Sequence, residues 1–411
     1  MHGEIITIGD ELLSGRVRDL NAYYLSMRIS SLGIVITATS TVGDDPKAIS
    51  EALERAVSRS EFVLVCGGLG PTEDDITARV AADFFDCPLV LNEKTLQYIK
   101  DSLKKRGLPW LDAYKKLAYI PEGARLIDPQ GQVCGFYCHS GEKPIFFLPG
   151  IPEEVRLLAD SKVLPLLVSY DSKRAVVRQR IFKTFGLQEA RIGELLAGVA
   201  DPEQGELIGY YPNFPENHVS VTVRRNTVGE AEEALREIEK EVEARLNPYV
   251  IAKDASSLEM SVGQMLRAAG FRLAVAESCT GGLICHRITS VSGSSDYFER
   301  GVIVYSNESK IEMLGVPPEI IKAHGAVSAE TAASMARGIR SVSRTDLGLA
   351  VTGIAGPTGG TADKPVGTVF IALADADGVE AERFQFSGTR EQVKILAAQT
   401  ALNWVFLYFK R

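Results

Sequence analysis

Short, fully apolar runs that alternate with helix-like segments constrain the fold of this 411-residue sequence more than any other feature. In the first half these strand-like runs cover residues 4–8, 34–41, 62–66 and 145–148. The intervening segments with helical spacing of apolar side chains include residues 21–32 and 46–58. Strands that are apolar on both faces belong to parallel sheets, whose crossover helices cover both sides. The first half is therefore predicted to be a doubly wound α/β domain.

The third apolar run ends in the most informative loop of the first half, Gly67-Gly68-Leu69-Gly70-Pro71-Thr72-Glu73-Asp74-Asp75-Ile76-Thr77. Glycines at the carboxyl end of a strand leave backbone N–H groups bare for a phosphate, and Thr72 is expected to cap the next helix. The adjacent carboxylates of Asp74 and Asp75 can hold a divalent cation. The loop is not a Walker A motif, because it lacks the lysine. The alternative interpretation is a tight turn whose two acids serve the helix dipole. A second wall of the same pocket is expected from residues 149–154, at the end of the fourth run.

The character of the sequence changes at about residue 174. Strands are predicted at residues 176–185, 206–210 and 217–224, and helices at 188–196 and 229–246. This pattern is typical of a small α+β domain. The run from Lys253 to Ser257 indicates a linker, and Ser256 and Glu259 are expected to form a capping box for the next helix. The predicted domains are therefore residues 1–170, 174–252 and 257–411.

In the last domain the strand at residues 272–276 leads into Glu277-Ser278-Cys279-Thr280-Gly281-Gly282, a strand-to-helix corner. Such a corner exposes a hydroxyl above the sheet edge and directs free N–H groups at an anion or an oxyanion. Ser278 is therefore a candidate nucleophile. The alternative is that Ser278 and Thr280 merely cap the helix, while the glycines let it pack closely on the sheet.

Two further strand ends in this domain carry polar residues. The strand at 301–305 is followed by Lys310, and a desolvated lysine with a lowered pKa can take the proton of a serine. The strand at 347–351 is followed by Thr352 and a glycine-rich loop, and the ends of parallel strands converge on one edge of a sheet. Arg390, at the start of the last helix, could clamp a phosphate or could equally be a solvated first-turn arginine.

Charge and segment composition exclude several classes of protein. A net charge of −8 argues against a general nucleic-acid binder, which needs a basic footprint. The sequence has neither a signal-peptide pattern at its start nor an apolar run long enough to span a bilayer, so the expected location is the cytoplasm, without membrane contact. The six cysteines show no disulfide-framework spacing, and Cys134 and Cys138 lack the second ligand pair of a zinc site.

With these motifs in order, the chain resembles the CinA family of competence/damage-inducible proteins over essentially its whole length. The segments that carry the resemblance are residues 67–77, 149–153, 276–282, 305–310, 325–328 and 352–360. The resemblance implies a C-terminal amidohydrolase that converts nicotinamide mononucleotide to nicotinic acid mononucleotide and ammonia without a cofactor. It also implies an N-terminal molybdopterin-binding-like domain, which in some family members hydrolyses ADP-ribose with a divalent metal, and a KH-like middle domain.

The residues of the amidohydrolase that carry over are Ser278 as nucleophile, Lys310 or Tyr305 as base, and Thr352. Substrate contacts are expected from the turn, the glycine loop and the last helix, that is from Cys279, Thr280, Gly281, Gly282, Gly353, Gly356 and Arg390. Cys279 is an alternative nucleophile.

For the N-terminal domain the resemblance implies a pyrophosphatase that uses Mg, Mn or Co. The expected metal ligands are Asp74, Asp75, Asp10 and Glu11, and the expected substrate-binding residues are Gly67, Gly68, Gly70 and Thr72. A second hypothesis is that this domain binds a pterin or nucleotide without turnover, or serves as a competence-related interaction module. The expected partners are pyridine nucleotides and ADP-ribose, and RNA is not among them because residues 174–255 contain no Gly-x-x-Gly. A homodimer is the default expectation.

Overall fold

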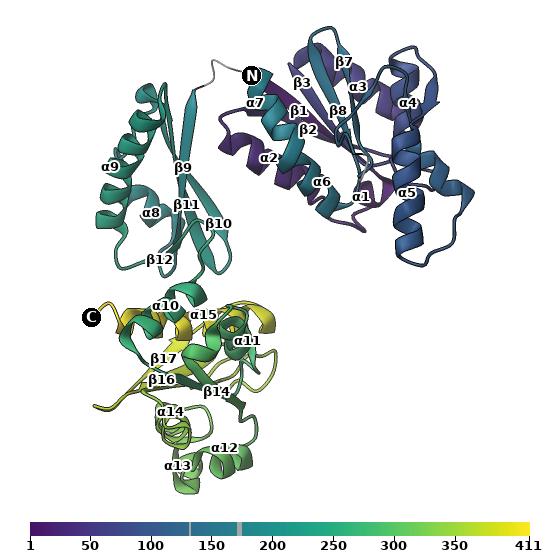
Figure 1. Ribbon diagram of the computed structural model, residues 1–411. Helices are drawn as coiled ribbons and strands as arrows, with labels where there is room; N and C mark the ends of the chain where they lie inside the picture. Colours follow the sequence, from purple (N-terminus) through teal and green to yellow (C-terminus); the bar gives the residue numbers. More distant parts are fainter. Residues whose placement is uncertain (131–132, 171–174) are drawn as a thin grey trace. The chain divides into compact units, whose positions relative to one another are not determined.

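The computed structural model describes residues 1–130, 133–170 and 175–411, and its main sheets have six, four and five strands (Figure 1). The chain forms two compact units, one of Met1–Arg178 with Val223–Glu233 and the other of Gln179–Thr222 with Ala234–Arg411. The three domain ranges given above stay predictions, and the start of the middle one, residue 174, lies outside the described residues. Among the described helices, none combines the length and the apolar character needed to cross a membrane.

The six-stranded sheet of the first unit has the order β2-β1-β3-β8-β7-β6. Its parallel strands are β1 (His2–Ile8), β2 (Val35–Val42), β3 (Phe62–Cys66) and β8 (Lys143–Leu148). The antiparallel edge is β7 (Phe136–Ser140) and β6 (Arg125–Leu126). A separate antiparallel pair consists of β4 (Leu89–Leu91) and β5 (Tyr119–Pro121).

Helices cover both faces of this sheet. Successive side chains of each central strand point to opposite faces, so each strand contributes to two cores. Ile5 belongs to one core, with α2 (Asn21–Ser31), α6 (Pro152–Leu158) and α7 (Leu164–Tyr170). Ile6 belongs to the other core, with α3 (Pro46–Arg59) and α4 (Thr77–Phe84). The remaining elements are α1 (Asp10–Leu13), α5 (Glu93–Lys105), η1 (Asp112–Ala118) and η2 (Ala159–Val163). The predicted doubly wound domain is confirmed.

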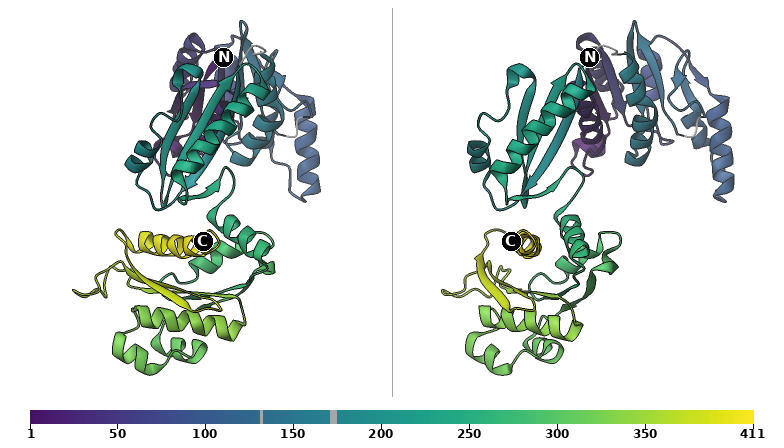
Figure 2. Two further views of the ribbon diagram at one scale, coloured as in Figure 1. Left: turned by 90° about the vertical axis from the view of Figure 1, so that its left-hand side faces the viewer. Right: turned by 60° about the vertical axis from the view of Figure 1, so that its left-hand side comes forward.

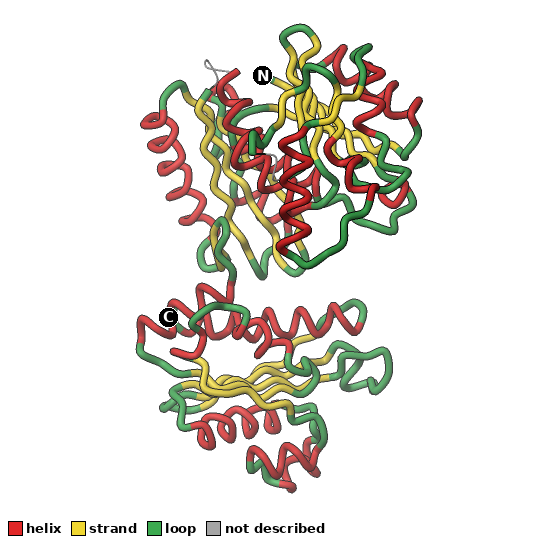
Figure 3. Tube along the Cα trace, turned by 45° about the vertical axis from the view of Figure 1, so that its right-hand side comes forward, coloured by secondary structure: helices red, strands yellow, loops and turns green. Residues whose placement is uncertain are grey.

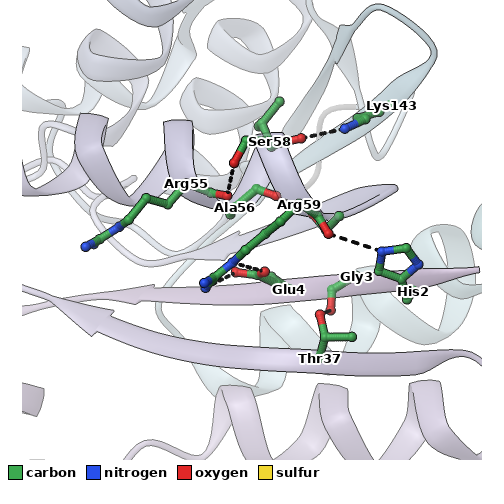
Figure 4. A network of polar contacts seen from close by, with 11 residues as sticks. His2, Gly3, Glu4, Thr37, Arg55, Ala56, Ser58, Arg59 and Lys143 are labelled. Atoms are coloured by element: carbon green, nitrogen blue, oxygen red, sulfur yellow. Dashed lines mark hydrogen bonds and ion pairs between the residues drawn. The ribbon is translucent and has the colours of Figure 1, made fainter.

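An ion pair between an exposed arginine and a buried glutamate fixes α3 on the sheet (Figure 4). The carboxylate of Glu4, on β1, is 2% exposed and accepts from Nε and Nη2 of Arg59 at 2.5 and 2.9 Å. A ring nitrogen of His2 lies 3.1 Å from the Arg59 carbonyl, and Lys143 Nζ donates to the Val57 carbonyl at 2.6 Å. These contacts hold the C-terminal end of α3 at the amino end of β1, so the helix begins at the opposite sheet edge, where the parallel strands end.

The middle sheet has the order β10-β11-β9-β12 and lies beside α9 (Figure 2). Its strands are β9 (Val176–Thr184), β10 (Glu206–Asn213), β11 (Glu216–Arg225) and β12 (Val250–Lys253). The helices are α8 (Glu189–Leu195), η3 (Pro202–Gln204) and α9 (Val228–Leu246). The apolar stripe of α9 is buried, which accounts for the amphipathic pattern of the sequence. The predicted α+β character is confirmed.

The C-terminal sheet has the order β14-β13-β15-β16-β17. Its strands are β13 (Leu273–Glu277), β14 (Phe298–Ile303), β15 (Leu347–Gly353), β16 (Thr368–Ala374) and β17 (Val379–Gln385). β13 is parallel to both β14 and β15, whereas β15, β16 and β17 are antiparallel neighbours. The carboxyl ends of β13, β14 and β15 therefore meet at one edge.

Helices cover both faces of this sheet as well (Figures 1 and 3). One layer consists of α10 (Leu258–Ala269), α11 (Leu283–Thr289) and α15 (Arg390–Tyr408). The other consists of α12 (Asn307–Leu314), α13 (Pro318–His324) and α14 (Ala329–Ser343), and η4 (Ser294–Asp296) precedes β14. The predicted capping box of α10 is wrong by one residue, because Ser257 is the N-cap and accepts from the Met260 amide.

Candidate active site

Ser278 lies at the first position after β13, in a turn that precedes α11. Its amide donates to the Val351 carbonyl on β15 at 3.0 Å, so the backbone of the serine is fixed between two parallel strands. The side chain is 7% exposed. β13 itself is buried along its whole length, as the apolar sequence predicts. The corner therefore holds one hydroxyl in a largely desolvated position at the edge of the sheet.

Glu277, rather than a hydroxyl residue, holds the start of α11. Its fully buried carboxylate accepts from the amides of Gly282 and Cys285 at 2.8 Å and from that of Ile284 at 3.2 Å. Gly282 is the N-cap residue, and no side chain caps the helix from that position. The interpretation of Ser278 as a helix cap is therefore wrong. An acid at the end of an otherwise apolar strand was the signal in the sequence that could have revealed this role.

Lys310 reaches the corner at Ser278 from α12, not from a strand end as the sequence suggested. Its Nζ lies 3.3 Å from Ser278 Oγ and donates to the carbonyls of Val304 and Tyr305 at 2.8 and 3.1 Å. The residue is 1% exposed. Burial lowers the pKa of Lys310 below its ordinary value, because a cation loses hydration there. Ser306 caps α12 and so sets the turn of the helix that carries the lysine.

Tyr305 and Arg390 lie at the open side of this corner. Tyr305 follows the end of β14 and is 64% exposed, and its hydroxyl lies 3.4 Å from Arg390 Nη2. Arg390 also donates from Nη1 to the Gly356 carbonyl at 2.6 Å. The arginine therefore joins the loop after β14 to the glycine loop after β15. The tyrosine contributes its carbonyl to Lys310, while its phenol is in contact with the arginine.

Thr352 is buried at the end of β15, and its hydroxyl donates to the Ala326 carbonyl at 2.8 Å. The next residue, Gly353, packs closely on β16, since a Cβ there would lie 2.7 Å from a Val369 methyl group. The structure thus brings Thr352 to the same sheet edge as Ser278, with its hydroxyl proton engaged by the neighbouring loop.

The turn itself contains both a thiol and unengaged amides. Burial raises the pKa of the Cys279 thiol to about 12, which disfavours the thiolate that a cysteine nucleophile requires. Gly281 has φ +62°, and its amide donates to the Ser278 carbonyl at 3.2 Å. In the described part of the chain, the amides of Cys279 and Thr280 donate to no other residue. These two N–H groups are the donors left for an oxyanion beside Ser278.

The glycine loop after β3 depends on close packing of its backbone. Gly67 has φ +109°, and a Cβ there would lie 2.3 Å from the Ile8 carbonyl oxygen, so only glycine fits. Thr77 fixes the loop by donating from Oγ1 to the Gly67 carbonyl at 2.9 Å. Across the described residues, the amides of Gly68 and Gly70 have no hydrogen-bond acceptor. The bare N–H groups that the sequence predicted are therefore present.

A cavity of about 500 Å³ adjoins this loop. Polar and charged side chains along its wall include Glu73, Asp75, Arg79, Thr95 and Lys116, and apolar ones include Leu89, Tyr119, Ile120 and Phe136. The residues that were expected to form a second wall, 149–154, do not line it.

Thr72 does not cap α4, which begins at Thr77 with Ile76 as N-cap. Instead, the amide and hydroxyl of Thr72 both donate to Asp75, within the loop. Lys116 Nζ donates to the Thr72 carbonyl from the side of η1.

Asp10 and Asp44 form a reciprocal pair at the ends of β1 and β2. The Asp10 amide donates to Asp44 Oδ2 at 2.9 Å, and the Asp44 amide donates to Asp10 Oδ1 at 3.3 Å. Burial raises the pKa of Asp44, and the charges of Asp10, Glu11 and Asp74 raise it further. Asp44 was not among the ligands expected from the sequence. Its position at a parallel strand end, beside that of β1, was the available signal.

These carboxylates fit a divalent cation in their chemistry, since Mg²⁺ and Mn²⁺ prefer oxygen ligands and the repulsion around Asp44 favours a positive charge. The geometry is less complete. Within residues 1–130, 133–170 and 175–411, no three or more His, Cys, Asp or Glu side chains are gathered closely enough to hold a metal. Of the expected ligands, Asp10, Glu11 and Asp74 all raise the pKa of Asp44 through their charges. Asp75 instead lines the neighbouring cavity.

Three family models match successive parts of the chain. The probable molybdopterin binding domain matches residues 4–168, the damage-inducible protein CinA KH domain residues 179–252, and the CinA C-terminal domain residues 255–409. A CinA-like protein of Geotalea uraniireducens is 42% identical over 401 residues, covering 97% of this chain and 96% of that protein. One from Syntrophus aciditrophicus is 43% identical over 407 residues, covering 98% and 97%.

Among solved structures, a competence/damage inducible protein from Agrobacterium tumefaciens has 37% sequence identity, with a TM-score of 0.35, and covers 37% of this chain and 96% of its own. The full-length relatives match at over 40% identity and cover nearly all of both chains. The chain therefore belongs to the CinA family, with a molybdopterin-binding-like N-terminal domain, a KH-like middle domain and a CinA C-terminal domain.

Proposed function

We propose that the C-terminal domain is an amidohydrolase that converts nicotinamide mononucleotide to nicotinic acid mononucleotide and ammonia. The observation that carries the proposal is the buried pair of Lys310 Nζ and Ser278 Oγ, 3.3 Å apart. A serine is a poor nucleophile unless a base takes its proton, and a lysine whose pKa is lowered by burial is such a base.

In the proposed reaction the neutral amine of Lys310 accepts the proton of Ser278 while Oγ attacks the carboxamide carbon. The tetrahedral intermediate collapses, its C–N bond breaks, and the proton on Lys310 passes to the departing nitrogen, which leaves as ammonia. Water, deprotonated by the same amine, then attacks the acyl-enzyme; the ester bond to Ser278 Oγ breaks, and the proton returns from Lys310 to Oγ as the acid leaves. The carbonyls of Val304 and Tyr305 hold the amine in place for both half-reactions.

The negative charge that develops on the carboxamide oxygen needs donors near Ser278. We assign this role to the amides of Cys279 and Thr280, which donate to no other residue in the described part of the chain. Tyr305 is assigned to the substrate opening rather than to proton transfer, because its phenol contacts Arg390 and not Lys310 or Ser278. Thr352 supports the sheet edge through Ala326.

Ammonia release from nicotinamide mononucleotide by the purified full-length protein tests this proposal. Ser278→Ala should abolish release, because Oγ of Ser278 is the atom that forms the bond to the carboxamide carbon. Ser290→Ala removes a hydroxyl that bonds the helix carbonyl of His286 and serves as the matched control, with activity near that of the unsubstituted protein. Absence of ammonia with the unsubstituted protein, or full activity in Ser278→Ala, contradicts the assignment.

For the N-terminal domain we propose metal-dependent hydrolysis of ADP-ribose to AMP and ribose 5-phosphate. The support is the combination of unengaged glycine-loop amides with the carboxylates of Asp10, Glu11, Asp44 and Asp74 at neighbouring strand ends. These carboxylates would hold Mg, Mn or Co, and such a cation supplies positive charge that polarises a phosphoryl oxygen.

The alternative for this domain is binding of a pterin or nucleotide without turnover. Formation of AMP from ADP-ribose with each metal, and with chelator, separates the two. Asp74→Ala combined with Asp75→Ala should reduce turnover, and Asp44→Asn should do so on its own. Binding without AMP under every metal condition would favour the alternative.

A further inference from the structure

Lys394 is a cation beside the turn that carries Ser278, and it has no role in the proposed reaction. It lies on α15, one helical turn after Arg390, and is half-buried. A Cβ added to Gly281 would lie 3.7 Å from Lys394 Nζ, and no other atom would be within 4 Å of it. The charges of Lys310 and Lys394 both act to lower the pKa of Cys279, against the larger effect of burial. The lysine thus reaches from the last helix to the turn that carries the serine.

The three cations around this turn, Lys310, Arg390 and Lys394, differ in their hydrogen-bond partners. Lys310 is held by backbone carbonyls and by Ser278, and two nitrogens of Arg390 are held by Gly356 and by the Tyr305 hydroxyl. Lys394, by contrast, has no hydrogen bond or ion pair with any of the described residues. Glu277, the buried acid of the turn, accepts hydrogen bonds from three amides. A lysine ammonium group with no protein partner, beside the turn that carries Ser278, is free to contact an anion of a bound ligand.

We propose that Lys394 binds the phosphate of the substrate, and that it makes this site select a nucleotide over the corresponding nucleoside. Lysine acts as a compact point charge toward phosphate and needs no preset bidentate geometry. Arg390, whose nitrogens tie Gly356 to Tyr305, is then a positioning residue that holds the two loops of the opening together. The inference rests on the proposed amidohydrolase function and assigns a specificity-determining residue of the same site.

The test compares nicotinamide mononucleotide with nicotinamide riboside, which lacks the phosphate. Lys394→Met keeps most of the length of the side chain and removes the charge, and Lys394→Arg restores the charge. Lys322→Met makes the same charge change at an exposed position of α13. Lys394→Met is expected to raise KM for the nucleotide about tenfold, with kcat nearly unchanged and with no effect on the riboside. Lys394→Arg should recover most of the loss, and Lys322→Met should match the unsubstituted protein.

A binding measurement separates this inference from the proposed reaction. In the Ser278→Ala protein, which cannot turn over, calorimetry gives the Kd of nicotinamide mononucleotide with and without Lys394→Met. Weaker nucleotide binding in the double variant supports the phosphate role even if the unsubstituted protein releases no ammonia, in which case only the proposed reaction falls. Ammonia release combined with an unchanged nucleotide-to-riboside preference in Lys394→Met overturns the inference and leaves the reaction standing. Equal nucleotide affinity in both Ser278→Ala proteins, or no binding in either, also overturns it.

Discussion

At the scale of single residues, the contact between Lys310 and Ser278 makes the proposed reaction dependent on pH. Burial lowers the pKa of Lys310, and only the neutral amine can accept the serine proton. The value of kcat/KM should therefore rise with pH through this lowered pKa and level off before the pH at which an ordinary exposed lysine titrates. A pH profile of ammonia release measures the position of that limb.

Lys310→Arg is the companion variant, because arginine keeps the positive charge but stays protonated at every accessible pH. It should lose about 10²- to 10⁴-fold in kcat, which is the usual contribution of a positioned base. A profile without a rising limb from acidic to alkaline pH, or an arginine variant within a few-fold of the unsubstituted protein, would remove Lys310 from the proton transfer.

Residue types and strand ends predicted part of the candidate site. Ser278 and Lys310 were both anticipated, and the structure brings them together. Glu277 and Asp44 were missed, because their roles depend on how each carboxylate folds back onto amides, at α11 and at Asp10 respectively. The expected cap at Thr72 was wrong for a similar reason, because the Thr72 hydroxyl donates to Asp75 within the loop and does not cap the helix. Side-chain direction within a turn is not encoded in a pattern of residue types.

At the scale of elements, apolar runs predicted the buried strands well and the edge strand poorly. β14 was expected at residues 301–305 and lies at Phe298–Ile303. Within the sheet it pairs only with β13, so the register with Leu273–Glu277 sets its limits. Its side chains are mostly half-buried or exposed, and the apolar run continues past the strand to buried Val304. In a central strand the buried residues are also the paired residues. In an edge strand the two sets can differ, so an apolar run does not mark the limits of the strand.

Close packing of α14 on the C-terminal sheet yields a stability prediction. A Cβ on Gly348 of β15 would lie 2.3 Å from the carbonyl oxygen of Ala336, on α14. Backbone cannot move aside as a flexible side chain can, so Gly348→Ala should force the helix from the sheet. The expected cost is about 1–3 kcal/mol in the free energy of unfolding of this unit.

Urea unfolding followed by fluorescence of Trp404, on α15 in the same unit, measures this cost in a Trp110→Phe background. Gly378→Ala, in the turn between β16 and β17, is the matched control, since a Cβ there meets nothing within 4 Å. Equal midpoints for the two alanine variants would mean that α14 tolerates the displacement without loss.

At the scale of the whole molecule, each candidate site is built from the residues of one compact unit. Asp10, Asp44 and Asp74 belong to Met1–Arg178, whereas Ser278, Lys310 and Lys394 belong to Ala234–Arg411. Each unit also has cores on both faces of its own main sheet. No side chain of the first group is needed to form the second site, so the two proposed activities should respond to different perturbations.

Chelation of metal and the Ser278→Ala substitution are therefore expected to stop different reactions of the same full-length protein. EDTA should stop AMP formation from ADP-ribose, because the carboxylates around Asp44 then lack the cation that offsets their charge. Ammonia release should persist in EDTA, because the proposed base is the amine of Lys310. Ser278→Ala should show the reverse pattern. Both products are measured in parallel on one preparation, and restoration of AMP by added Mg²⁺ or Mn²⁺ controls for damage by the chelator. A parallel loss of ammonia in EDTA, reversed by the same metals, would place a metal requirement in the C-terminal unit and contradict the independent sites inferred from its residues.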